Sequence, residues 1–214
     1  MSDTKTNELI APRPPRFELI AGAVCLDFIN TLDDRYTAQP TELLKSYLDL
    51  ARFGEDAGIV APALAHRLIE TGYGSPKAAQ VLASAIAMRE VMFAVFNAII
   101  HKQPVPAAPL MKLNGYVQSA AQHARLAQMS GGFEWRFDAL PPGLDAPLWP
   151  IARSAADLLA SDEVAYVRAC ASETCQWMFL DTSKNHQRRW CDMTKCGNRA
   201  KFRRFWARKK KADG

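Results

Sequence analysis

The sequence predicts an α+β protein: a predominantly helical N-terminal domain with a small β-hairpin, followed by a C-terminal cysteine-containing ribbon and a basic helix. Three observations predict this class. Segments with apolar residues at helical spacing fill most of the chain up to residue 160. A Ser-Gly-Gly turn precedes alternating aromatic and charged residues from Phe133 to Phe137, which is typical of a hairpin. Four of the five cysteines form two pairs near the C-terminus, with four residues between partners.

Composition narrows the class further. The chain has 214 residues, 49% hydrophobic and 23% charged, which is typical of a globular protein. No apolar run reaches the roughly 18 residues that span a membrane, and the first 16 residues lack the apolar core of a signal peptide. We therefore expect a cytoplasmic protein with no membrane partner, in which paired cysteines are metal ligands rather than disulfides.

Three regions are expected. Residues 1–16 are polar, contain three prolines and are expected to be flexible. Residues 17–160 form the helical domain and residues 164–211 the cysteine module. Within the helical domain we expect a short strand after Phe17 and a hairpin around residues 124–137. The expected helices cover residues 24–32, 42–53 with Thr41 as N-cap, 62–71, 76–101 as the central helix, 108–123 and 147–161.

Four polar residues interrupt the apolar pattern of the helical domain: Asp27, Asn30, Thr31 and Arg89. The favoured interpretation is local hydrogen bonding and ion pairing, because buried polar groups usually find such partners. The alternative is that they line a pocket for a small molecule. Cys25, which has no partner cysteine nearby, is expected to be a core residue.

The paired cysteines predict one structural zinc ion, bound by Cys170, Cys175, Cys191 and Cys196. Four thiolates complete a tetrahedral Zn²⁺ site and leave no position open for water, so the site is structural rather than catalytic. We expect a zinc ribbon with extended segments at 164–168 and 177–180. Gly197 should permit the tight second turn, and Asn198 should cap a helix over 199–211.

The cysteine module is strongly basic. Residues 164–214 contain 13 Lys and Arg against 4 Asp and Glu, whereas the remainder contains 14 against 18. Such a cluster suggests a surface that binds phosphates, with DNA favoured and RNA open. A solvated charged face, or docking to an acidic protein, are the alternatives. The candidate nucleic-acid contacts are Arg188, Arg189, Arg199, Lys201, Arg203, Arg204 and Arg208.

Several motifs in the sequence resemble those of a known family. Cys170-x4-Cys175, the segment from Phe179 to Asn185, and Cys191-x4-Cys196-Gly-Asn-Arg199 resemble the CGNR zinc finger. The segment Gly22-x-x-Cys-Leu-Asp27-Phe-Ile-Asn30-Thr31 resembles the start of the ABATE domain, its usual N-terminal partner. The resemblance implies a stress-induced bacterial transcriptional regulator with a DNA-binding zinc finger.

The leading hypothesis is therefore a transcriptional regulator whose helical domain senses a small-molecule effector or forms a homodimer. We expect no enzymatic activity, because no catalytic spacing of Ser, His, Asp or paired carboxylates is present and the four histidines are dispersed. The alternative is an enzyme or small-molecule-binding protein with a pocket around Asp27, Asn30 and Arg89 and a purely structural zinc ribbon.

Overall fold

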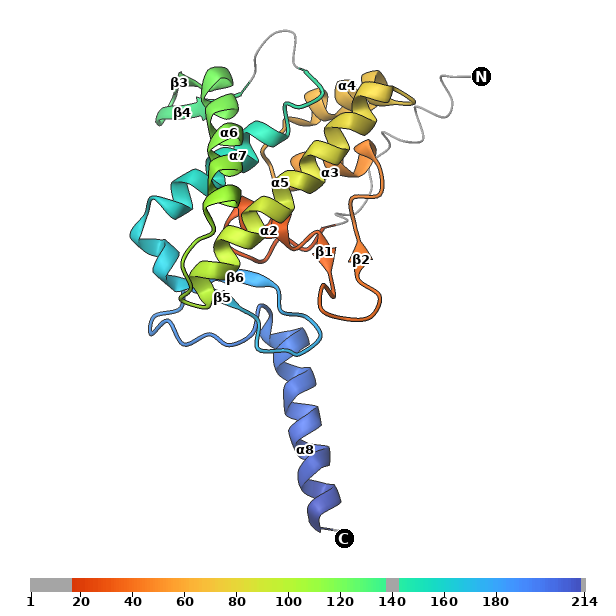
Figure 1. The fold of residues 1–214 in the computed structure, drawn as a ribbon, viewed down its shortest axis with the longest axis vertical. Helices are drawn as coiled ribbons and strands as arrows, with labels where there is room; N and C mark the ends of the chain where they lie inside the picture. Colours follow the sequence, from red (N-terminus) through yellow and green to blue (C-terminus); the bar gives the residue numbers. More distant parts are fainter. Residues whose placement is uncertain (1–16, 138–142, 213–214) are drawn as a thin grey trace.

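The computed structural model describes residues 17–137 and 143–212, and within the last helix the side chains of residues 204, 207 and 210–212 are outside that description. The predicted flexible segment 1–16 also lies outside the described residues. A helical body occupies the upper part of Figure 1, a small sheet lies beneath it, and the C-terminal helix extends away from both. The predicted fold class, a helical domain with small hairpins and a C-terminal cysteine ribbon, is confirmed.

The elements follow in chain order. The body contains α2 (Val24–Ile29), β1 (Leu32–Asp33), β2 (Thr41–Glu42), α3 (Tyr47–Asp56), α4 (Pro62–Gly72), α5 (Pro76–Ile100), α6 (Ala107–His123), β3 (Arg125–Met129), β4 (Gly132–Arg136) and α7 (Leu148–Leu159). The module contains a 3-10 turn (Asp162–Tyr166), β5 (Val167–Ala169), β6 (Met178–Leu180), a π-helical turn (Met193–Gly197) and α8 (Asn198–Ala212). Consecutive strands pair antiparallel as three separate two-stranded sheets.

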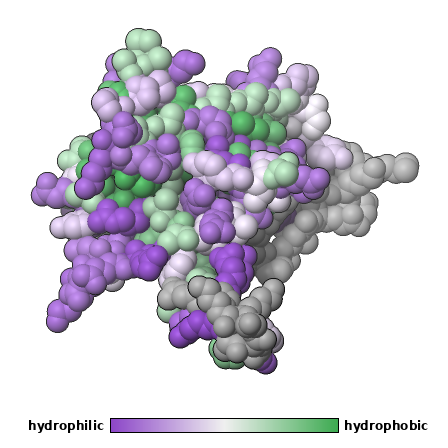
Figure 2. All heavy atoms as spheres, turned by 60° about the horizontal axis from the view of Figure 1, so that its bottom comes forward, coloured by the Kyte–Doolittle hydropathy of each residue, from purple (hydrophilic) through white to green (hydrophobic). Residues whose placement is uncertain are grey.

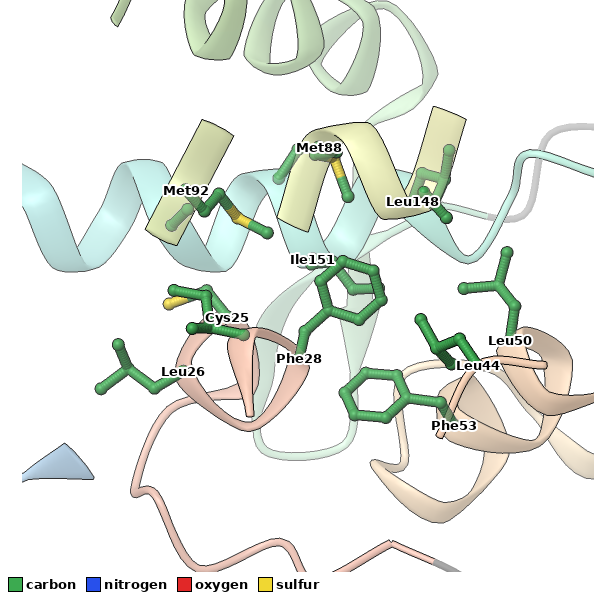
Figure 3. Packing of buried hydrophobic residues seen from close by; sticks show 14 of the residues in the cluster. Cys25, Leu26, Phe28, Leu44, Leu50, Phe53, Met88, Met92, Leu148 and Ile151 are labelled. Carbon is green, nitrogen blue, oxygen red and sulfur yellow. The ribbon is translucent and has the colours of Figure 1, made fainter. Parts of the chain in front are cut away.

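The core lies around the short helix α2, which packs against both α5 and α7. Figure 3 shows Cys25 and Phe28 of α2 facing Met88 of α5 and Ile151 of α7. Phe28 also meets Phe53 of α3 edge to face, with ring centroids 5.3 Å apart. Cys25 is fully buried, and burial raises the pKa of its thiol to about 12. It is therefore a neutral core side chain, as predicted.

Helix α5 crosses the middle of the body and is by length and composition the one described helix that could span a membrane. The expectation that no segment is long and apolar enough is therefore too strict. Its buried residues, from Ala78 to Ala98, face α2, α3 and α6. Central helices of globular proteins are similarly apolar, because other helices cover most of their faces.

Two local predictions are wrong. The helix expected from residue 42 begins at Tyr47, because Ser46 and Asp49 form a reciprocal capping box, while Thr41 and Glu42 pair with β1. The strand expected after Phe17 is replaced by bends over residues 17–23, although Ala21 O accepts one ladder-like bond from Leu180 N at 2.7 Å. The other helix predictions agree with the structure to within a few residues.

The predicted hairpin is confirmed as β3 and β4, joined by a two-residue turn at Ser130–Gly131. Its aromatic side chains are not in the core: Phe133 and Trp135 are exposed. The guanidinium of Arg153 on α7 lies 4.4 Å from the Trp135 ring centroid and holds the hairpin beside the body.

Candidate metal centre

The four cysteines of the module meet at one point. Their sulfur atoms all lie within 4.8 Å of one another, and each residue is buried. The Sγ atoms of Cys175 and Cys191 are 3.5 Å apart, and those of Cys191 and Cys196 are 3.7 Å apart. Zn–S bonds of about 2.3 Å in a tetrahedron place sulfurs roughly 3.8 Å apart. The tetrad therefore fits one structural zinc ion, as predicted.

The charges of the tetrad require a cation. Hydrogen bonding with Cys175 and Cys191 lowers the pKa of Cys170, whereas the hydrogen bond with Cys170 raises the pKa of Cys175. Four thiolates this close repel one another in a site shielded from water, so they cannot all ionise alone. A divalent zinc ion offsets the repulsion and holds all four as thiolates.

The first pair of ligands is positioned by the small sheet. Cys170 follows β5 directly, and its backbone N–H donates to Trp177 O at 2.8 Å, one residue before β6. Cys175 closes a turn in which its own N–H donates to Ser172 O. Gln176 then adopts a left-handed backbone with φ of 50°, which turns the chain into β6. The two strands thereby bring Cys170 and Cys175 to the same end of the hairpin.

The second pair is positioned by a π-helical turn. Asp192 caps this turn by accepting hydrogen bonds from the backbone N–H groups of Thr194 and Lys195. Gly197 ends the turn, and its φ is not positive, so a left-handed backbone is not what favours glycine there. A Cβ there would lie 2.4 Å from Met193 Sδ and 3.2 Å from Trp190 Cδ1. Close side-chain approach therefore requires the glycine.

Asp181 organises the loop that connects the two pairs of cysteine ligands. Its carboxylate is buried and accepts hydrogen bonds from Ser183 N, Ser183 Oγ and Arg188 N. These donors outweigh burial and lower the pKa of Asp181. His186 stacks on Tyr166, with ring centroids 3.6 Å apart, and its Nδ1 hydrogen-bonds Asp181 O. It takes no part in the cysteine cluster.

The metal module is fastened to the body by Asn30, the C-cap residue of α2, and by Asp33 of β1. Asn30 makes two hydrogen bonds with one residue of β6: Nδ2 donates to Met178 O and Oδ1 accepts from Met178 N, both at 2.9 Å. Trp177 Nε1 donates to Asp33 Oδ1 at 2.7 Å. The side chain of Asn30 thus pairs with the edge of β6 as a neighbouring strand would.

Asp27 and Thr31, also considered as pocket residues, bind their own chain. Thr31 Oγ1 donates to Phe28 O at 2.8 Å, and Asp27 Oδ1 accepts from Ala21 N at 2.9 Å. Both side chains are buried. Burial raises the pKa of Asp27 to about 6, although the Ala21 and Ile20 backbone hydrogen bonds oppose the shift.

The raised pKa of Asp27 predicts a pH dependence of stability. The Asp27 carboxyl binds its proton more tightly in the folded state than in the unfolded chain. Its contribution to the free energy of unfolding therefore falls as pH rises from about 4 through about 6. We expect the free energy of unfolding of Asp27→Asn, measured relative to wild type, to be about 1.4 kcal/mol greater at pH 8 than at pH 5. Urea titrations of both zinc-loaded proteins across that range measure it, and contributions from the cysteines cancel in the difference. A constant difference would contradict the prediction.

Arg89 lies at the centre of a buried ion-pair network. It is 2% exposed and donates Nη1 and Nη2 to the two carboxylate oxygens of Glu42 at 2.7 and 2.6 Å. Its Nε donates to Glu90, and Nη1 also reaches Thr31 Oγ1 at 3.1 Å. Arg35 pairs with Glu90 from the other side. Burial lowers the pKa of Arg89, but the two glutamates outweigh it and raise the pKa overall.

The geometry therefore gives Arg89 a structural position: its guanidinium joins α5 to the β1–β2 hairpin. The sequence signal for this role was the charged pair Arg89-Glu90 within an apolar stripe. No signal identified Glu42 as the partner, because residue 42 was assigned to the first turn of a helix. The contacts of Asn30 and Asp33 with the metal module were also missed, since they join residues more than 140 positions apart.

The predicted nucleic-acid residues divide into two groups. Arg188 and Arg199 face the metal centre: Arg188 donates to Trp190 O and Cys191 O, and Arg199 Nη2 lies 3.9 Å from Cys196 Sγ. These contacts stabilise the turns that carry Cys191 and Cys196. Arg189, Lys201, Arg203 and Arg208 are exposed, and the side chain of Arg204 lies outside the described part of the chain.

Helix α8 is the most prominent feature of the lower end. It projects from the metal centre away from the helical body, and only its N-terminal end lies close to the body (Figure 1). Its three aromatic side chains are each more than half exposed: Phe202, Phe205 and Trp206. In Figure 2, which turns this end forward, hydrophilic residues cover much of the face, with smaller hydrophobic areas between them. The backbone of α8 does not run back along the acidic body (Figure 1).

Comparison with known proteins identifies both parts. A family model named ABATE, described as "Putative stress-induced transcription regulator", matches residues 22–162. A second model, the CGNR zinc finger, matches residues 166–209 and includes all four cysteines. No curated protein matches the chain.

Proposed function

Because the chain belongs to the ABATE family and carries a CGNR zinc finger, we propose that it is a transcriptional regulator that binds DNA through its C-terminal module. The observation that carries the proposal is the charge and position of α8. The 15 residues of this helix include eight Lys and Arg and no acid. Its described cationic residues are exposed, and the helix itself projects away from the body (Figure 1).

A helix of this composition is poorly stabilised by its own side chains. Cations four positions apart, such as Arg199 and Arg203, repel one another along the helix. Phosphate oxygens at the spacing of a nucleic-acid backbone would relieve that repulsion and release counterions. The helix diameter also suits the major groove of B-form DNA.

Zinc supports this function by fixing where α8 begins. Cys196, Gly197 and Asn198 lead directly from the metal ligand into the helix, and Asn198 Nδ2 donates to Thr194 O at 2.9 Å. A closed four-thiolate site has no open position for substrate, so we propose no catalytic step for this protein. A cytoplasmic location, where bacterial DNA lies, follows from the proposal. The body would supply effector sensing or homodimer formation.

The test compares two charge-matched double variants. Lys201→Ala with Arg203→Ala is expected to weaken binding to a 20-base-pair duplex at least tenfold at about 100 mM salt. The slope of log affinity against log salt should fall in magnitude by about 2, because two phosphate contacts are lost. Fluorescence anisotropy of a labelled duplex across a salt series measures both quantities.

The control is Arg67→Ala with Lys102→Ala, two exposed cations of the body whose removal changes the net charge equally. It should change affinity less than twofold. Equal effects of the two pairs would mean that binding follows net charge rather than α8. Undetectable binding to DNA and RNA at low salt would refute the proposal, and a preference for an RNA of the same sequence would redirect it to RNA.

A further inference from the structure

A cleft opens among the helices of the body. It lies between α5, α6 and α7 and has a volume of about 580 Å³. Volumes of roughly 300–1,000 Å³ are usual for small-molecule sites in proteins. The cleft shares no lining residue with the metal centre or with the Arg89 network.

The floor of the cleft is apolar. It is formed by Val81 and Met88 of α5 and by Leu148, Trp149 and Ala152 of α7, all of them buried. Trp149 is held in place by a stacked contact with His123, with ring centroids 3.8 Å apart. A rigid aromatic and aliphatic floor binds a hydrocarbon or aromatic body through burial of apolar area.

The rim of the cleft is polar and positively charged. Lys77 of α5 and Lys112 of α6 contribute two exposed ammonium groups, and Asp145 contributes the single carboxylate among the lining residues. Ser84 and Ser119 add hydroxyl groups that can donate hydrogen bonds. The lining therefore has one net positive charge, which favours a ligand with an anionic group at the rim.

Gly115 lies at the open side of the cleft. It lies within α6 and lines the cleft, and a Cβ at this position would meet no atom within 4 Å. Its φ is not in the left-handed region, so neither packing nor backbone conformation requires glycine. A glycine inside a helix costs about 0.8–1 kcal/mol relative to alanine. A large side chain at this position would extend into the cleft beside Tyr116, whereas a methyl group would not fill it.

We infer that this cleft is a binding site for an amphipathic monocarboxylate, with its apolar body against Trp149 and Tyr116 and its carboxylate between Lys77 and Lys112. The site differs from the cluster of Asp27, Asn30, Thr31 and Arg89 in which a pocket was considered from sequence. In the proposed regulator, this cleft would be the site that binds the effector. Binding itself stands whether or not α8 binds DNA.

The experiment measures binding of decanoate to the zinc-loaded full chain by isothermal titration calorimetry, with decanamide and decylammonium as ligands of matched length. Decanoate is expected to bind at least tenfold more tightly than decanamide, and decylammonium more weakly than either. Lys112→Gln should weaken decanoate binding at least fivefold. Lys102→Gln, an exposed lysine outside the cleft, should change it less than twofold.

Gly115→Phe tests the location. It is expected to abolish decanoate binding by filling the cleft, whereas Gly115→Ala keeps affinity within twofold and raises the melting temperature. The Ala variant separates loss of space from a change in helix propensity, and an unchanged circular dichroism spectrum shows that the Phe variant is folded. Absent decanoate binding, equal affinities for decanoate and decanamide, or full affinity in Gly115→Phe would each overturn the inference. These assays use no nucleic acid, so their failure is distinct from failure of DNA binding.

Discussion

Cys170→Ser is expected to remove zinc from the protein and unfold the metal module. The four sulfurs lie within 4.8 Å of one another and are the only ligand set of this kind among the described residues. Structural zinc contributes apparent binding free energies of about 10–16 kcal/mol in small zinc-finger peptides, and binding and folding are coupled there. Three remaining thiolates leave the ion incompletely coordinated. The module, whose sheet has two three-residue strands, cannot retain its fold without the ion.

Zinc content per chain and the circular dichroism spectrum measure this outcome, and Cys196→Ser should behave in the same way. The matched control is Cys25→Ala, which removes the fifth buried cysteine from the core between α2 and α7. It should keep one zinc per chain and lose about 1 kcal/mol of unfolding free energy through the small cavity. Retention of one zinc per chain by either serine variant would contradict the prediction.

Arg89→Met is expected to reduce the free energy of unfolding by about 3 kcal/mol. The substitution leaves the carboxylates of Glu42 and Glu90 without their buried partner, and breaking a buried ion pair from one side costs roughly 3–5 kcal/mol. We use the lower end because the side chains of Glu42 and Glu90 are 32% and 43% exposed and can be partly hydrated. Glu90 also keeps Arg35.

Urea denaturation of the zinc-loaded protein at pH 7 measures the loss. The comparison is a double-mutant cycle with Glu42→Gln, in which the second substitution should cost much less in the Arg89→Met background than in wild type. Glu134→Gln, which breaks the exposed pair with Arg136 on the hairpin, is the control and should cost less than about 1 kcal/mol. A loss below about 1 kcal/mol for Arg89→Met would show that the network is energetically unimportant.

The sequence was informative wherever the signal was local. Ser75-Pro76 marked the start of α5, and the Ser-Gly-Gly turn marked the hairpin. The cysteine spacing identified the metal ligands, because four thiolates in two close pairs have few other uses in a reducing compartment. Thr41 misled because an N-cap residue followed by an acid is equally compatible with a strand end, and the Ser46–Asp49 box lay only five residues further on.

Long-range partnerships could not be read in the same way. Asn30 was recognised as an unusual polar residue, but its partner is the backbone of Met178, which any residue type would supply. The cleft between α5, α6 and α7 is formed by three helices whose relative placement depends on tertiary packing. The exposure of Phe202, Phe205 and Trp206 was likewise invisible, since aromatic spacing alone does not state what covers a helix face.

The hydrogen bonds of Asn30 with Met178 have a consequence for how the protein responds to metal supply. An ion that binds only the folded module also stabilises whatever that module holds, by a free energy that grows with the logarithm of free zinc. Because β6 is joined to α2, and α2 lies at the centre of the body, scarcity of zinc would loosen the helical domain together with the finger. We therefore expect the two family segments to lose stability together when zinc is scarce.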